Sequence, residues 1–255
     1  MPDSETSYEN TLGPYLSEDG EIDPVTNEPF SIRNIRHIIR DTVTCNLKII
    51  PSALALAGTD FELTTELVGA SMSGSAEHKL AIFHRIRNVV DELKNDFDII
   101  IMDGTPSLGI LPLNIVFASD VLVVPVPTES NDFASTMTFC DLYREHCSTF
   151  LENFGDYIKL PEVLFMPTRY SSSEQNSTSG SAFVLDQIRN TFGKDCMFSV
   201  IRRHDAVVSN LTLLRRTAFQ VNAKDAGISR EALAKAIQNF SEAFDEILKR
   251  TLLSK

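Results

Sequence analysis

Three short apolar runs, each followed by polar or proline-containing turn residues, alternate along this chain with longer segments of helical periodicity. The runs lie at 97–103 (FDIIIMD), at 120–127 (DVLVVPVP) and near 162–167. Continuous apolar runs of this length are typical of strands that are buried on both faces of a parallel sheet. The alternation therefore predicts an α/β fold with a doubly wound, mainly parallel sheet and a single core.

Apolar residues at helical spacing predict the helices between and around these runs. A first helix follows Ser31, the expected N-cap, and Gly193 is expected to end the helix that contains SAFVLDQIRNTF. Short strands are expected in NLKIIPS, where Pro51 stops the strand, and in CMFSVI. The other helices are expected at 59–70, 76–94, 110–119, 131–153 and 229–250.

Charge is distributed unevenly along the chain. The net charge of −12 by itself argues against nucleic acid or an anionic membrane as a partner. Residues 1–30, however, hold eight acidic and no basic residues, whereas residues 201–255 hold ten basic and six acidic ones. We expect residues 1–30 to form a loosely ordered acidic arm and residues 31–255 to form the domain.

Targeting and metal-binding patterns are missing from the sequence. The first ten residues have neither the basic nor the apolar region of a signal peptide, and no apolar run approaches the ~18–20 residues that cross a bilayer. The four cysteines form no CxxC pair and the five histidines show no zinc-binding spacing. These patterns predict a cytoplasmic protein without a zinc site or a disulfide framework.

The residues that follow the predicted strands are candidates for the binding site, because ligands of open α/β sheets bind at the carboxyl ends of the strands. Asp103 closes the first run, as does the acid that holds Mg²⁺ or its water shell in P-loop NTPases. The alternative is an acid that caps the following turn. Thr105 and Ser107 either cap the next helix or, with the helix N-terminus, face a γ-phosphate.

The segment 96–139 closely resembles the ParA family of partition ATPases, which includes the plasmid proteins called RepA. Many spaced positions over some 40 residues carry the resemblance: Phe97, Asp98, Asp103, Pro106, Leu108, Gly109, Asn114, Ala118, Asp120, Pro125, Pro127, Asp132 and Ser135. Thr105 stands where the family has the first of two prolines. NLKIIPSALALAGTDFEL upstream and MPTRY and IRRHDAVVSNLTLLRRTAF downstream extend the resemblance to roughly residues 40–250.

The phosphate-binding loop of that family is not found in this sequence. Its members carry KGGxGKT near the N-terminus, yet Lys194 is the single lysine here that follows a glycine, and no GxxxxGK[ST] occurs. The resemblance therefore implies a P-loop NTPase-like domain without its first strand, phosphate loop and first helix. Because the loop supplies most of the phosphate binding, we expect this chain alone to have no significant ATPase activity, and to be marginally stable or to associate.

The resemblance also implies roles for individual residues in the complete protein. Asp103 is expected to position Mg²⁺ through water and to assist catalysis, and Thr105 and Pro106 to shape the γ-phosphate turn. Thr168 and Arg169 stand where the family contacts base and ribose, the alternative for Arg169 being a surface arginine that begins a loop. Four arginines of the basic segment are expected either to bind DNA phosphates or to form a solvated helix face: Arg202, Arg203, Arg215 and Arg216.

Three functions are compatible with these patterns. The first is a DNA-segregation ATPase that binds ATP and Mg²⁺, forms a dimer, binds DNA without sequence preference on the nucleoid, and is stimulated by a centromere-binding ParB-type protein. The second is a non-enzymatic module that modulates a full-length relative or DNA. The third, a MinD-like membrane-associated ATPase, is disfavoured because the C-terminal KRTLLSK is short and follows an acidic stretch.

Overall fold

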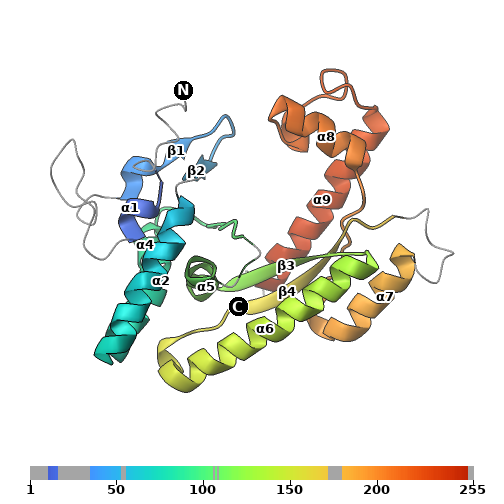
Figure 1. Cartoon of the computed structure of the whole chain (residues 1–255). Coiled ribbons are helices and arrows are strands. Elements are labelled where there is room, and N and C mark those ends of the chain that lie inside the picture. The colour runs from blue at the N-terminus through green and yellow to red at the C-terminus, as the bar shows by residue number, and fades with distance from the viewer. Residues whose placement is uncertain are drawn as a thin grey trace. The chain divides into compact units, whose positions relative to one another are not determined.

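A computed structural model of the chain describes residues 11–16, 35–52, 56–105, 107, 109–171 and 180–251. The chain divides into two compact units. The first unit comprises residues 1–120 and 147–161, and the second comprises residues 121–146 and 162–255. Helix α6 (Ser130–Phe154) contributes residues to both units (Figure 1).

The second unit contains the parallel sheet that the sequence predicts. Strands β3 (Val121–Pro127) and β4 (Glu162–Thr168) pair in parallel, from Val121 opposite Glu162 to Pro127 opposite Thr168. The predicted short strand at 196–201 lies beside β4 as a single bridge between Cys196 and Phe165. The backbone N–H groups of Met197 and Ile201 donate to carbonyls of β4, at 2.8 and 2.9 Å.

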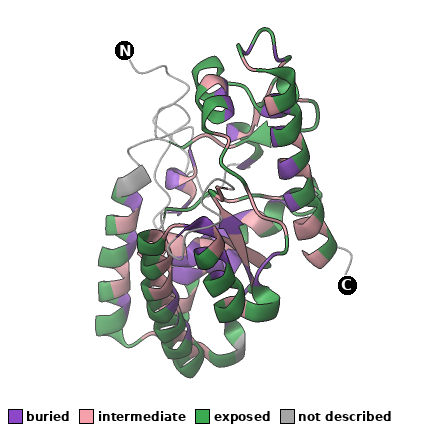
Figure 2. Cartoon of the chain, turned by 90° about the vertical axis from the view of Figure 1, so that its right-hand side faces the viewer, coloured by how far each residue is buried: buried purple, intermediate pink, exposed green. Residues whose placement is uncertain are grey.

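Helices cover both faces of this sheet, which confirms the α/β class. On one face, Val124, Val126 and Phe165 pack against α6 and α7 (Ser181–Phe192), which ends at Gly193 with φ +53°. On the other face, Leu164 and Met166 pack against α9 (Arg230–Thr251). The long helices carry their buried residues along one side (Figure 2). Among the described residues, no helix is long and apolar enough to cross a membrane.

The second unit also holds one helix that the sequence analysis did not predict. Helix α8 (Asp205–Leu214) is followed by the 3-10 turn η8 (Ala218–Gln220). Val207 and Leu211 of α8 pack with Leu233 and Ala236 of α9. The 3-10 turn η7 (Gly193–Asp195) links α7 to the bridge beside β4.

The first unit is mostly helical. Its long predicted helix at 76–94 is divided at His84, which has φ −102° and ends one helix as it begins the next. The first predicted helix is described only as a 3-10 turn at 35–38, and Ser31 lies outside the described residues. The elements are α1 (Gly13–Leu16), η4 (Ile35–Ile38), β1 (Arg40–Asp41), β2 (Lys48–Ile49), α2 (Leu56–Ser73), α3 (Ala76–Phe83), α4 (Arg85–Leu93), α5 (Ile110–Ala118) and η5 (Gly155–Tyr157).

The described part of the predicted N-terminal arm is packed into the first unit. Leu16 is fully buried in a cluster with Ile35 and Ile86, and the Arg85 side chain donates to the Leu16 carbonyl. Residues 1–10 and 17–30 of the predicted arm lie outside the described residues. The boundary at residue 30 stays a prediction.

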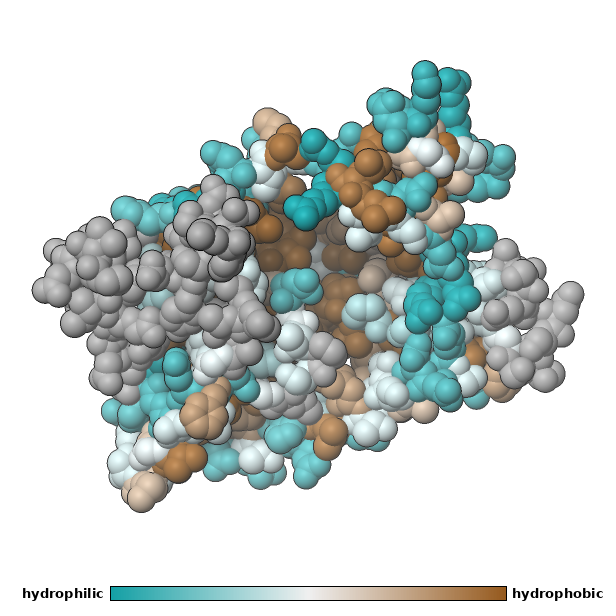
Figure 3. All heavy atoms as spheres, turned by 45° about the horizontal axis from the view of Figure 1, so that its top comes forward, coloured by the Kyte–Doolittle hydropathy of each residue, from teal (hydrophilic) through white to brown (hydrophobic). Residues whose placement is uncertain are grey.

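The predicted strand at 97–103 is wrong as a sheet strand. Among the described residues it has no ladder partner, although its side chains alternate as a strand's would. Ile100 and Met102 pack against the core, whereas Ile99 is 51% exposed and Ile101 is 80% exposed. An apolar run indicates a tendency to be buried but does not specify a pairing partner. Hydrophobic surface of this kind is visible on one face of the molecule in Figure 3.

Candidate functional site

Asp103 is the last residue of the segment 97–103 in the first unit, and its side chain is exposed. Thr105 is exposed as well, and its Oγ1 lies 3.3 Å from the Oγ of Ser107. Pro106 lies outside the described residues. The hydroxyls of Thr105 and Ser107 thus contact one another, and the role of Asp103 stays a prediction.

A carboxylate from another helix occupies the N-terminus of α5. The backbone N–H of Leu111 donates to Asp60 Oδ1 at 2.8 Å, and the N-cap residue Gly109 has no side chain to make such a bond. A Cβ on Gly109 would lie 2.6 Å from Asp60 Oδ2, so the close approach of the carboxylate requires glycine. A negative charge is favourable here because the free N–H groups of a helix N-terminus are partially positive.

This contact corrects the expectation that Thr105 or Ser107 caps the helix. Within the described residues, the capping group is Asp60 of α2, about 50 residues earlier in the chain. The sequence contained one signal for it. In NLKIIPSALALAGTDFEL, Asp60 occupies the position at which the ParA-type pattern has an acidic residue.

The N-terminus of α5, the helix that follows Asp103 in the chain, is occupied by a carboxylate in this structure. The helix N-terminus that would face a γ-phosphate already donates a hydrogen bond to Asp60, and a second anion there would be repelled. The 255 residues contain no GxxxxGK[ST] loop. Among the described residues, no group of three or more His, Cys, Asp or Glu side chains is placed to hold a metal ion.

Thr168 is the last residue of β4 in the second unit, and Arg169 follows it. The Thr168 carbonyl accepts the backbone N–H of Thr128 at 2.9 Å, which ties the ends of the two strands together. Arg169 has φ +58°, a left-handed conformation that costs an ordinary residue roughly 1–2 kcal/mol. Its guanidinium pairs with Glu129 at 3.2 Å and with Asp132 at 3.5 Å. Contact of these two residues with base and ribose stays a prediction.

Arg202 and Arg203 line a pocket of about 470 Å³ within the second unit. Tyr170, Ser171, His204, Ser229, Glu231, Ala232 and Lys235 complete its wall. Basic side chains from the residues just before α8 and from α9 meet there, so we call this site the basic pocket. Lys235 could not be recognised from the sequence, because nothing in the local pattern distinguishes it from a solvated lysine on a helix.

A buried asparagine on α9 fixes the backbone of this segment. Asn239, 7% exposed, accepts the backbone N–H of Arg202 at 2.8 Å and donates to the carbonyl of Val200 at 2.8 Å. The Nε2 atom of His204 lies 3.2 Å from the same Asn239 oxygen. The Asn239 side chain therefore hydrogen-bonds to the backbone of both Val200 and Arg202, and so holds the segment that carries Arg202 and Arg203.

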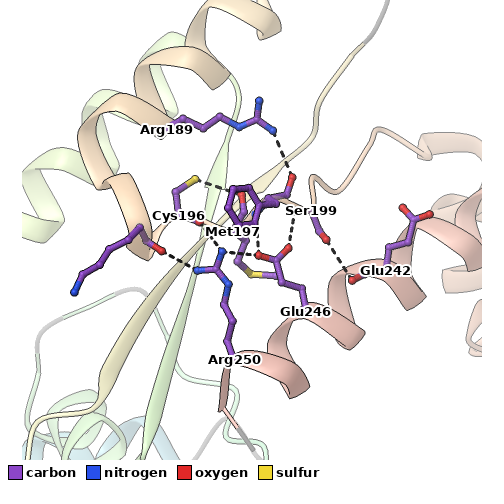
Figure 4. Close-up of polar contacts among 9 residues, drawn as sticks. Arg189, Cys196, Met197, Ser199, Glu242, Glu246 and Arg250 are labelled. Atoms are coloured by element: carbon purple, nitrogen blue, oxygen red, sulfur yellow. Dashed lines mark hydrogen bonds and ion pairs between the residues drawn. The ribbon is translucent and has the colours of Figure 1, made fainter. Parts of the chain in front are cut away.

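A second contact set on α9 holds the preceding residues of the same segment (Figure 4). Glu246 accepts the backbone N–H groups of Phe198 and Ser199, at 2.8 and 2.6 Å. Arg250 pairs with Glu246 at 2.7 Å and donates to the carbonyls of Lys194 and Cys196. We call these contacts the α9 clamp.

Arg215 and Arg216 are not part of the basic pocket. Both are exposed at the C-terminal end of α8, where Arg215 adopts the left-handed conformation. Arg202 and Arg203 precede the N-terminal end of the same helix, whose ten residues span about 15 Å. The four predicted arginines thus form two pairs rather than one cluster.

Comparisons with known proteins agree with the resemblance seen in the sequence. Residues 13–143, about half of the chain, match the family described as an AAA domain. Protein SopA of Escherichia coli (strain K12) is 31% identical over 251 residues, which make up 98% of this chain and 58% of SopA. The virulence plasmid ParA family protein pGP5-D of Chlamydia psittaci is 24% identical over 252 residues, 98% of this chain and 85% of that protein.

A solved structure of a protein named Partition Protein is similar with a TM-score of 0.49 and 21% identity, over 64% of this chain and 42% of that one. The chain spans 58% of the length of SopA, so the activities of a whole SopA-like protein are not established for it. Family membership rests on the match of residues 13–143 and on the relatives that align along almost the whole chain. The chain therefore belongs to this AAA-domain family and, within it, to the ParA-type partition ATPases.

Proposed function

We propose that this chain serves DNA partition, as part of a ParA-type system that binds DNA through the basic pocket of the second unit. The pocket is the observation that carries the proposal. It gathers Arg202, Arg203, His204 and Lys235 on a chain whose net charge is −12. Guanidinium groups suit phosphate oxygens because they donate two parallel hydrogen bonds, and phosphate contacts do not depend on base sequence.

The remaining properties of such a system are also part of the proposal. The whole protein uses ATP and Mg²⁺, forms a dimer, acts in the cytoplasm on the nucleoid, and is stimulated by a centromere-binding ParB-type protein. Thr168 and Arg169 contact the nucleotide, Asp103 contributes to holding Mg²⁺ through water, and Arg215 and Arg216 extend the DNA contact beyond the pocket. Family membership supports these roles.

The DNA-binding proposal is tested with a charge-matched pair of variants. Arg202→Ala/Arg203→Ala is expected to weaken binding of double-stranded DNA at least tenfold in 50 mM salt. The magnitude of the slope of log K against log salt should fall by about 1 to 2, since Arg202 loses its phosphate contact and Arg203 loses one that its ion pair with Glu129 already weakens. Fluorescence anisotropy of a labelled random-sequence duplex over a salt series measures both quantities.

The control removes two positive charges elsewhere in the second unit. Arg144→Ala/Lys249→Ala changes exposed residues of α6 and of the C-terminal end of α9. This control should change the affinity for DNA by no more than about twofold relative to wild type, because charges beyond a Debye length of about 10 Å are largely screened. Equal losses in the two variants, or a wild-type chain that does not bind DNA at low salt, would refute DNA binding through the pocket.

We further propose that the chain by itself does not hydrolyse ATP. Asp60 occupies the α5 N-terminus and the sequence has no phosphate loop, so we expect phosphate release from ATP and Mg²⁺ at the background rate. A sensitive phosphate assay on the purified chain measures this. Turnover that follows the protein through purification and is lost in Asp103→Ala would overturn the prediction.

The second candidate function is a non-enzymatic module that retains the DNA and partner surfaces. The lack of a GxxxxGK[ST] loop within these 255 residues favours it, because that loop supplies most of the phosphate binding in the family. The nucleotide sequence upstream of the start codon separates the two candidates. An in-frame KGGxGKT there favours the ATPase, whereas a dedicated ribosome-binding site at Met1 favours the module.

A further inference from the structure

Glu129 is shared between two arginines to which the sequence analysis gives different roles. It lies between the end of β3 and the start of α6. Its Oε1 atom is 2.5 Å from Arg203 Nη2 and 3.2 Å from Arg169 Nη2. Arg203 lines the basic pocket, and Arg169 directly follows the last residue of β4. One carboxylate oxygen therefore contacts both guanidinium groups within the second unit.

The charges of the basic pocket are largely compensated by carboxylates. Arg203 pairs with Glu129, and Lys235 pairs with Glu231 at 2.6 Å. The Glu129 pair is the less exposed of the two, with side chains 38% and 35% accessible compared with 77% and 68%. A phosphate that binds Arg203 must therefore compete with Glu129, whose carboxylate lies 2.5 Å from the Arg203 guanidinium.

Arg169 offers Glu129 an alternative partner. Its guanidinium also contacts Asp132, and its left-handed backbone places the side chain toward the start of α6. A carboxylate drawn toward Arg169 pairs less tightly with Arg203, because one oxygen accepts from both. We propose that Glu129 is an internal competitor that lowers the affinity of the basic pocket for phosphate groups, and that Arg169 relieves this competition.

This inference rests on the proposed DNA contact of the pocket and makes its own quantitative prediction. Glu129→Gln is expected to raise the affinity for a random-sequence duplex by about two- to fivefold, the range that a partly exposed ion pair allows. The magnitude of the salt slope should rise by up to about 0.9, because Arg203 becomes available for a phosphate contact. Fluorescence anisotropy over a salt series provides both readouts.

Removing one negative charge raises affinity for DNA in a general way, so the control must remove one elsewhere. Asp141→Asn serves, since Asp141 is exposed on α6 and pairs with Arg144 rather than with a pocket residue. Arg169→Ala should lower the affinity about twofold in the wild-type background and should have no effect in the Glu129→Gln background. Such a double-mutant cycle separates the coupling from the loss of charge.

The outcomes distinguish this inference from the function on which it rests. If neither wild type nor Glu129→Gln binds DNA, both proposals fall. If the wild type binds, and Glu129→Gln matches Asp141→Asn or binds more weakly, DNA binding stands and the competition is refuted. Equal effects of Arg169→Ala in the two backgrounds would refute the relief by Arg169.

Discussion

Replacing Glu246 with alanine is expected to lower the free energy of unfolding by about 1–3 kcal/mol, because two backbone N–H groups and the Arg250 guanidinium lose their carboxylate acceptor. The α9 clamp shows why. Glu246 accepts two backbone N–H groups, of Phe198 and Ser199, and its side chain is 13% exposed. Arg250, 20% exposed, would lose its carboxylate partner as well. Urea denaturation at pH 7 measures the difference.

The same residue makes the stability depend on pH. Burial raises the pKa of Glu246, but the hydrogen bonds from Ser199 and Phe198 and the charge of Arg250 outweigh it and hold the pKa below its usual range. A carboxyl whose pKa is lower in the folded chain stabilises that state above the unfolded pKa, about 4.3 for glutamate. This contribution is fully present at pH 7 and is lost as the pH falls through the folded pKa.

The difference between wild type and Glu246→Ala should therefore shrink as the pH is lowered from 5 toward 3. Glu242→Ala is the matched control, one turn earlier on α9, where an exposed glutamate bonds to Gln238 and its backbone carbonyl accepts from Ser199. The control should change stability by less than about 0.5 kcal/mol. A Glu246→Ala effect no larger than the control's, or one that persists unchanged at pH 3, would contradict this account.

The clamp also connects stability with the proposed function. It fixes residues 194–199, and Asn239 fixes 200–202, so α9 determines how Arg202 and Arg203 are presented. Few of these contacts could be predicted from the sequence. Glu246 and Arg250 have the spacing of an ordinary helical ion pair, and their partners lie about 50 residues earlier in the chain.

The sequence was a good guide where the determining pattern is local. Both parallel strands, β3 and β4, fall within two residues of their predicted bounds, because each is a continuous apolar run whose residues are mostly half-buried. Helix α7 ends at Gly193 as expected, since a left-handed C-cap favours glycine. The family could also be identified from spaced motif positions.

Prediction failed where the outcome depends on a distant partner. The run at 97–103 has the composition of a strand, yet pairing requires a neighbour that composition does not specify. The α5 cap comes from Asp60, and Arg169 and Arg203 share Glu129 across 40 and 74 residues. Helix α8 was not predicted because its apolar residues do not all lie on one face: Val207 and Leu211 are buried, whereas Leu213 is exposed.

Phe117→Ala is expected to destabilise the first unit strongly, with a loss of about 3–5 kcal/mol of unfolding free energy. Phe117 is 1% exposed near the end of α5. The centroid of its ring lies 6.0 Å from that of Phe83, in an edge-on arrangement, and 5.1 Å from that of Phe150. The Phe117 carbonyl accepts a hydrogen bond from the Arg87 guanidinium. Truncation opens a cavity between three elements that cannot collapse without moving α5.

Two control variants distinguish the effect of this cavity from a general loss of stability. Phe117→Leu keeps most of the volume and should cost about 1.5 kcal/mol or less, and Phe61→Ala removes an aromatic ring that is 76% exposed, at less than about 0.5 kcal/mol. Because α5 also carries Gly109 against Asp60, hydrogen exchange at Leu111 should accelerate in Phe117→Ala. Equal losses in the alanine and leucine variants, or unchanged protection at Leu111, would show that α5 is not held through this ring.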